Sequence, residues 1–314
     1  MKLALAPISY YWPRDTVLEF YRAAAHTAVD VVYLGETVCS RRHELKLRDW
    51  LEVADLLTAA GKEVLLSTPA LIESESELKA LRRIVENGRF MVEANDMGAV
   101  RLLEGRGPFA AGSGLNIYNP DVLEFLAGLG ARRWVAPVEL PSAALAAMQA
   151  QRPAGVETEV LAYGRLPLAL SARCFTARRF NLQKDACGFR CLDYPDGLPL
   201  HTRDGRAFLV LNGLQTQSAA VCNLIRELPE MARLGVDVIR LSPRSQGMAE
   251  IAALFRRVAQ QPGEAAAAAA QLNAVAPGDT CNGYWHGAPG IERVDAADMR
   301  QAPAADSAAT EWRR

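Results

Sequence analysis

The chain has 314 residues, half of them hydrophobic and 23% charged, and its 35 Lys and Arg residues nearly balance 36 Asp and Glu residues. A net charge of −1 argues against a protein that works by bulk electrostatic binding of nucleic acid or anionic lipid. Six cysteines are too few for a disulfide scaffold at this length, which is sufficient to bury a core without one.

Short β-rich runs alternate with amphipathic helical patterns along most of the chain. We predict strands at 3–8, 31–35, 63–68, 90–95, 110–116, 134–140, 158–162 and 236–242. We predict helices between them at 16–28, 47–60, 76–87 and 121–130, and a closing helix at 248–260 with Ser245 as its N-cap. Eight strands that alternate with helices predict an α/β fold, a (β/α)8 TIM-like barrel.

The connection between the seventh and eighth predicted strands is unusually long, about 70 residues where most others have about 20 to 30. We interpret 171–235 as an insertion that carries cysteines and a β-hairpin turning at Arg203-Asp204-Gly205, followed by a helix over 219–235. Loops at the carboxyl ends of barrel strands form the active face, so the insertion is expected over the site. The prediction is one domain over 1–293 and an unstructured tail over 294–314.

Four cysteines form the main candidate for chemistry. Cys174, Cys187 and Cys191 have C-x12-C-x3-C spacing after the seventh predicted strand, and Cys39 follows the second. Both segments leave the same end of the predicted barrel, so the four thiols can converge there. Four thiolates suit a structural zinc ion or an iron-sulfur cluster, and the lack of paired CxxC motifs favours the cluster. Buried, redox-inert thiols are the alternative.

Basic residues and two further cysteines accompany this pattern. Basic residues surround the clustered thiols and would lower thiolate pKa values, although a solvated basic loop explains them equally well. They are Arg173, Arg178, Arg179, Lys184 and Arg190. Cys222 lies in an apolar pattern typical of a core, and Cys281 has no assigned role.

Polar residues at strand ends are the candidates for a substrate-facing set at the barrel mouth, with helix caps and internal salt bridges as the alternative explanation. They are Glu36, Glu93, Asn116, Glu139 and Arg240. The C-x3-C-x2-C spacing of radical S-adenosylmethionine enzymes is absent after Cys191. The sequence also has no phosphate-binding glycine loop, so we predict no nucleotide or flavin cofactor. It has no recognisable Ser or Cys protease triad, so we assign no catalytic residue.

Several segments together resemble peptidase family U-32, to about Trp285. They are YYWP, YLGETVCSRR, VENGRF, LNIYN, PVELP, YGRLPLALSARCFTAR with the following C-x3-C, FLVLNGLQT, DVIRLSP and CNGYW. Within the family they look closest to bacterial proteins of oxygen-independent ubiquinone biosynthesis. The resemblance implies that Cys39, Cys174, Cys187 and Cys191 ligate a 4Fe-4S cluster.

The resemblance also implies partners and a reaction. It implies a heterodimer with a paralogous, cluster-bearing family member, and a lipid-carrier protein that presents a prenylated quinone precursor for anaerobic hydroxylation. Prephenate is the implied oxygen donor, and which of the two subunits is catalytic stays open. An RNA-base hydroxylase or its accessory, and a U-32-type peptidase, are the alternative functions. With no apolar run of the ~20 residues that cross a bilayer, we expect a cytoplasmic protein without a membrane span.

Overall fold

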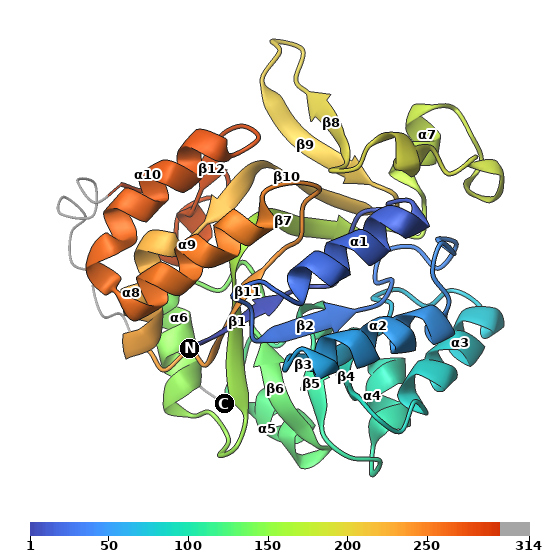
Figure 1. Cartoon of the computed structure of the whole chain (residues 1–314), viewed down its shortest axis with the longest axis horizontal. Helices are drawn as coiled ribbons and strands as arrows, with labels where there is room; N and C mark the ends of the chain where they lie inside the picture. Colours follow the sequence, from blue (N-terminus) through green and yellow to red (C-terminus); the bar gives the residue numbers. More distant parts are fainter. Residues whose placement is uncertain (296–314) are drawn as a thin grey trace, which may run out of the picture.

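The computed structural model describes residues 1–295 and contains a closed barrel of eight parallel strands. The barrel strands are β1 (Lys2–Leu5), β2 (Val31–Leu34), β3 (Glu63–Ser67), β4 (Met91–Ala94), β5 (Phe109–Ala111), β6 (Ala131–Val135), β7 (Glu157–Leu170) and β11 (Val238–Leu241). The ring closes because β11 pairs in parallel with both β1 and β7 (Figure 1). The predicted (β/α)8 barrel is confirmed, and each predicted strand overlaps an observed one, although the strands predicted over 110–116 and 134–140 already end at Ala111 and Val135.

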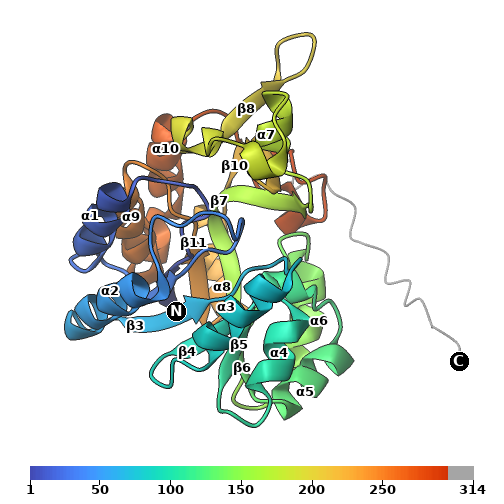
Figure 2. The same ribbon diagram turned by 90° about the vertical axis from the view of Figure 1, so that its right-hand side faces the viewer.

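Helices surround the barrel, and those predicted at 16–28, 47–60, 76–87, 121–130 and 248–260 are confirmed with small shifts of their ends (Figures 1 and 2). They are α1 (Arg14–Ala24), α2 (Leu47–Ala59), α3 (Glu75–Val85), α4 (Met97–Leu103), α5 (Pro120–Gly128), α6 (Ser142–Ala150), α8 (Leu228–Arg233), α9 (Met248–Gln260) and α10 (Ala265–Val275). Ser74 begins α3 with a capping box, in which its hydroxyl and the Glu77 carboxylate satisfy each other's backbone N–H groups. The predicted cap of α9 is wrong, because Gly247 precedes that helix and Ser245 instead donates its hydroxyl to Asp196.

Alternation along the strands divides the core into two layers. Leu3 and Leu5 of β1 point outward into the large cluster that the helices cover, whereas Ala4 points into the barrel. The barrel interior holds a small cluster with no exposed surface, in which Tyr33 and Leu65 are the largest apolar side chains. Small side chains such as Ala4 and Ala110 leave room there for the buried charged groups described below.

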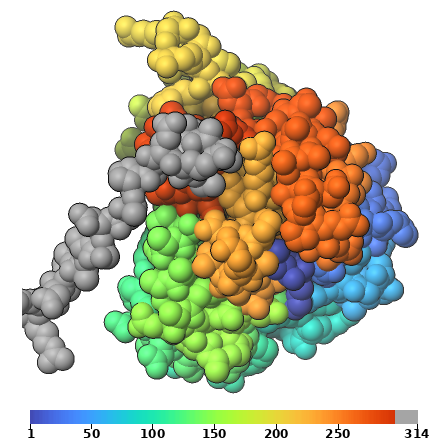
Figure 3. Space-filling model, turned by 90° about the vertical axis from the view of Figure 1, so that its left-hand side faces the viewer, coloured from blue at the N-terminus to red at the C-terminus, as the bar shows by residue number. Residues whose placement is uncertain are grey.

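The insertion extends the barrel sheet at one end. Strand β7 continues past the ring and pairs antiparallel with β10 (Gln215–Asn223), which is followed outward by β9 (Ala207–Asn212) and β8 (Leu198–His201). The predicted hairpin is confirmed: β8 and β9 are joined by a turn in which Gly205 has a φ of +83°. This hairpin stands out from the rest of the surface (Figure 3).

The predicted helix over 219–235 is wrong for its first part. Residues 219–223 belong to β10, where Cys222 pairs with Gly164 of β7 and with Cys281 of β12 (Thr280–Cys281), and α8 begins only at Leu228. A short apolar run fits a buried strand and a buried helix equally well, and here the two neighbouring strands supply backbone partners.

The predicted tail and the predicted absence of a membrane span are compared with residues 1–295. The predicted tail over 294–314 lies, from residue 296, outside them. Within 1–295, every helix is too short or too polar to cross a membrane.

Candidate functional site

The loop after β2 carries Cys39 and is folded by Glu36. The Glu36 carboxylate accepts the backbone N–H groups of Val38 at 2.8 Å and Cys39 at 3.0 Å. Burial raises the pKa of Glu36, while the Arg42 guanidinium and those two N–H groups oppose the rise. Glu36 therefore organises the cysteine loop, and it lies outside the lining of the cavity at the barrel mouth.

Cys174 follows the long strand β7 and caps the short helix α7 (Phe175–Arg179). Its sulfur accepts the backbone N–H of Ala177 at 3.4 Å. The helix is fixed to the turn between β9 and β10, because Phe175 N–H donates to the Gly213 carbonyl and Gly213 N–H donates to the Thr176 hydroxyl. The sheet extension thus determines where Cys174 lies.

Cys187 and Cys191 lie on a compact segment of two 3-10 turns, Lys184–Ala186 and Arg190–Asp193. Arg41 of the Cys39 loop holds this segment, since its guanidinium donates to the carbonyls of Lys184 and Asp185 and to the Asp185 carboxylate, each at 2.8 Å. Segments almost 150 residues apart in the sequence are thereby joined directly.

The four predicted thiols interact electrostatically. The charge of Cys174 raises the pKa of both Cys39 and Cys191, and the charge of Cys187 raises the pKa of Cys191. Burial raises the pKa of Cys39 to about 11 and also raises that of Cys191, while Arg42 opposes both rises. Within 1–295, no three Cys, His, Asp or Glu side chains are already arranged as a metal site. The structure brings the three cysteine-bearing segments together, and ligation by these thiols stays a prediction.

The surroundings of the thiols fit a negatively charged group bound by four sulfurs. Backbone N–H groups of Arg41 and Ala177 point to the sulfurs of Cys39 and Cys174. Arg42 lies within hydrogen-bonding reach of Cys191, and within residues 1–295 its buried Nε has no partner. N–H groups directed at thiolate sulfur and a nearby cation are the features by which proteins stabilise iron-sulfur clusters.

A cavity of about 430 Å³ opens at the carboxyl ends of the barrel strands. Its polar lining includes four of the five predicted mouth residues together with two more, and these six are Glu93, Asn95, Asn116, Glu139, Arg165 and Arg240. Thr37 and Val38 of the Cys39 loop also line it, as does Leu170 near Cys174. The cysteine segments therefore form part of the wall of the cavity.

Glu93 and Arg240 form the floor of the cavity as a buried ion pair. Arg240 donates to Glu93 at 2.7 Å and to Glu159 at 2.5 Å, and its guanidinium lies 4.1 Å from the centre of the Tyr33 ring. Glu93 also accepts the Ser67 hydroxyl at 2.6 Å. The internal salt bridge weighed as the alternative is therefore present for these two residues, which nevertheless face the cavity.

The remaining mouth residues differ in their surroundings. Asn116 has a φ of 53° at the end of a 3-10 turn, and Glu139 accepts the exposed Tyr118 hydroxyl at 3.0 Å. Arg165 was not favoured from sequence; its guanidinium donates to the carbonyls of Ser218 and Ala219, and it has no carboxylate partner within 1–295.

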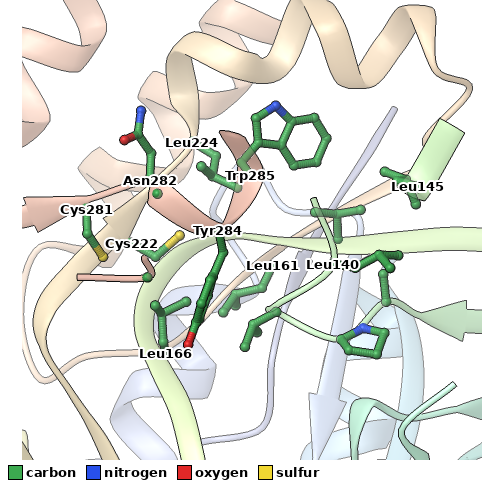
Figure 4. A pocket seen from close by; sticks show the side chains of 16 residues that line it. Leu140, Leu145, Leu161, Leu166, Cys222, Leu224, Cys281, Asn282, Tyr284 and Trp285 are labelled. Carbon is green, nitrogen blue, oxygen red and sulfur yellow. The ribbon is translucent and has the colours of Figure 1, made fainter. Parts of the chain in front are cut away.

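A second, small cavity beside the barrel is lined mainly by apolar side chains, including Leu140, Leu145 and Trp285 (Figure 4). Cys222 and Cys281 face each other across the β10–β12 pairing there, and both are buried. Cys222 is in the core as predicted, and Cys281 packs beside it.

The family of the chain follows from a match over most of its length. Residues 17–295 match peptidase family U32. The chain belongs to this family. Among solved structures, the U32 peptidase Mk0906 is similar with 11% sequence identity and a TM-score of 0.44, over 79% of this chain and 94% of that one. The spore cortex-lytic enzyme SleL of Bacillus megaterium has 11% identity and a TM-score of 0.40, over 81% and 73% of the two chains.

Sequence reasoning on this U32 protein missed the residues that bind the cysteine segments to one another. Arg42 donates to the Ser9 carbonyl at 2.6 Å and to Asn212 Oδ1 at 2.8 Å, and so joins the first barrel loop to the end of β9. The signal was present in the Ser40-Arg41-Arg42 run directly after Cys39, where consecutive arginines follow a candidate ligand. Their separate partners become evident only in three dimensions.

Proposed function

We propose that this U32 protein acts as a UbiV-type subunit, which holds a 4Fe-4S cluster and pairs with UbiU for the oxygen-independent hydroxylation of ubiquinone precursors. One observation carries the proposal: Arg41 and the sheet extension hold the three segments that carry Cys39, Cys174, and Cys187 with Cys191 together at the wall of the barrel-mouth cavity. In a U32 protein whose sequence resembles this branch of the family, that arrangement is best explained by a cluster next to a substrate site.

The four cysteines would hold the cluster through their thiolates, which are soft ligands suited to iron. When bound, such a cluster supplies one-electron transfer. The chain's own groups have distinct roles around it. Glu36 fixes the loop of Cys39, Arg41 fixes the segment of Cys187 and Cys191, and the backbone N–H of Ala177 stabilises the Cys174 thiolate.

The cavity suits a ring that carries both polar groups and an apolar chain. Its floor offers Arg240 and Glu93 as hydrogen-bonding groups, whereas Pro167, Leu168 and Leu170 of the β7 extension form an apolar side. Leu168 and Leu170 remain 38% and 37% exposed, so this apolar side continues to the surface. A prenylated precursor delivered by a lipid-carrier protein would enter along it.

The direct test is anaerobic co-purification of the chain with UbiU, followed by iron and sulfide analysis and electron paramagnetic resonance (EPR) of the reduced complex. We expect brown protein with about four irons for each cluster. A colourless protein with stoichiometric zinc would contradict the proposal, because zinc is the other metal that four thiolates select.

The pathway is tested in cells. A strain that lacks this gene should make no ubiquinone when grown without oxygen, and the wild-type gene should restore it. Cys39→Ala should fail to restore it, whereas Cys222→Ala, which alters a buried thiol of the core, should succeed. Restoration by Cys39→Ala would show that the reaction does not need the cluster in this subunit.

One observation favours a second candidate, an RNA-base hydroxylase. Arg173, Arg178 and Arg179 are exposed around Cys174, and within 1–295 none of them forms an ion pair. Such cations can hold phosphate groups, and binding to RNA would then weaken steeply as salt rises. Salt-dependent RNA binding together with normal anaerobic ubiquinone in the deletion strain would favour this candidate over the first.

A further inference from the structure

Arg42 is a cation buried where the cysteine-bearing segments meet. The whole residue is 4% exposed, and its guanidinium reaches the Ser9 carbonyl, the Asn212 amide oxygen and the sulfur of Cys191. The ring of Tyr11 covers it at 5.5 Å and in turn packs on Phe189, which lies between Cys187 and Cys191. Arg42 is thus shielded from water on the side of the sulfur site, the site formed by Cys39, Cys174, Cys187 and Cys191.

The charge of Arg42 is incompletely balanced by the protein. Its carboxylate partner is Glu36, at 3.6 Å, and the same Glu36 oxygen already accepts two backbone N–H groups. Ser9 and Asn212 are neutral acceptors, and Nε has no partner among the described residues. A buried guanidinium held in this way is costly unless a further negative charge lies beside it.

The sulfur site is where that negative charge would lie. Arg42 interacts electrostatically with both Cys39 and Cys191, which belong to two different segments of the chain. Four thiolates around a cluster carry a net negative charge, and each electron added makes it more negative. A fixed positive charge at short range in a medium of low dielectric constant favours the reduced state.

We propose that Arg42 is the positioning residue that sets the reduction potential of the cluster, by placing one buried positive charge against Cys191 and Cys39. The inference rests on the proposed function, since a potential exists only if the cluster does. Loss of the charge makes the cluster harder to reduce, and its midpoint potential becomes more negative. The hydrogen bonds of Arg42 to Ser9 and Asn212 hold the charge in place.

The other cations near the cysteines are placed differently. Arg41 is paired with Asp185 and Lys184 with Glu73, so their charges are already compensated. Arg178 and Arg179 are exposed, and solvent and salt screen them. These differences single out Arg42 as the cation with a strong effect on the buried sulfurs.

The test compares Arg42→Lys with Arg42→Gln in the anaerobic complex, by redox titration with dithionite followed by EPR. Arg48→Gln is the matched control, because Arg48 lies in the same part of the sequence, has a side chain that is 88% exposed and pairs only with Glu52 on its own helix. We expect Arg42→Lys and Arg48→Gln to titrate close to the wild type. We expect Arg42→Gln to show a more negative midpoint potential, a readout that a purely structural role would not move.

Each outcome decides the question. If the wild type has its cluster and Arg42→Gln titrates at the wild-type potential, or if Arg42→Lys shifts as far as Arg42→Gln, the inference is overturned and the proposed function stands. If Arg42→Gln fails to fold, as judged by circular dichroism, Arg42→Lys decides: a cluster at the wild-type potential supports the role of the charge, and loss of the cluster overturns it. A wild type without any cluster overturns the proposed function itself.

Discussion

Arg240 donates its Nε–H to Glu159 at 2.5 Å in the interior of the barrel, where Glu159 has no exposed surface. Glu159 also accepts a hydrogen bond from the Tyr33 hydroxyl at 2.5 Å, and Arg240 donates from Nη2 to Glu93 at 2.7 Å. The pair therefore connects the core of the barrel to the floor of the cavity. Each partner depends on the other, because both charges are buried.

Replacement of Arg240 by Met should strongly destabilise the fold, because it leaves Glu93 buried without a cation and Glu159 with only the more distant Arg133, at 3.9 Å. We expect a loss of about 3–5 kcal/mol in the free energy of unfolding, measured by urea denaturation. The exposed pair of Arg48 and Glu52 is the control, and Arg48→Gln should cost less than about 1 kcal/mol. Equal losses in the two variants would show that the barrel interior is hydrated.

Removal of any one predicted ligand should release the cluster. We expect Cys39→Ala, Cys174→Ala, Cys187→Ala and Cys191→Ala each to lose most of the iron found in the wild type, because each opens the metal to solvent. Cys222→Ala should retain it, since that thiol is buried in the core beside Cys281. The measurement is iron per chain after anaerobic purification, and iron loss from Cys222→Ala alone would show that the ligands are wrongly assigned.

The sequence predicted the barrel because its strands are regular and well separated by helices. Most barrel strands are short and mainly apolar, and some are followed by a helix with its own start signal, as at Ser74 and Asn119. The stretch around Cys222 was predicted as a helix because a short apolar run has no distinctive period. Only the pairing with Gly164 and Cys281 identifies it as a strand.

The site was predictable only in part. The spacing of the cysteines indicated which segments meet, since both leave the same end of the barrel. Glu36 was expected to face a substrate, but its side chain folds back onto Val38 and Cys39, and a sequence pattern does not fix the direction of a loop side chain. Arg42 follows Cys39 closely in the sequence, but its partners Ser9 and Asn212 are 33 and 170 residues away, so its role becomes evident only in the folded chain.

Gly213 tests whether the position of Arg42 matters apart from its charge. Gly213 has a φ of +64°, and a Cβ at this position would lie 2.8 Å from Arg42 Nη2. Gly213→Ala keeps every charged group but displaces the guanidinium, so we expect faster loss of iron to a chelator than in the wild type. Gly205→Ala is the control, because Gly205 has a φ of +83° but no atom within 4 Å of the added methyl group. Equal rates in the two variants would mean that backbone strain alone causes the effect.

The apolar side of the cavity should matter for the reaction without affecting the fold. Leu168 is 38% exposed and lines the cavity, whereas Leu56 is 40% exposed on α2 and lies outside its lining. Substitution of either by Asp should change the free energy of unfolding by a similar small amount, about 0.5 kcal/mol. We expect Leu168→Asp to lower anaerobic ubiquinone in the complemented deletion strain several-fold, because a charge opposes the entry of an apolar chain, and Leu56→Asp to leave it unchanged. Wild-type ubiquinone levels with Leu168→Asp would show that the apolar chain of the precursor does not pass along β7.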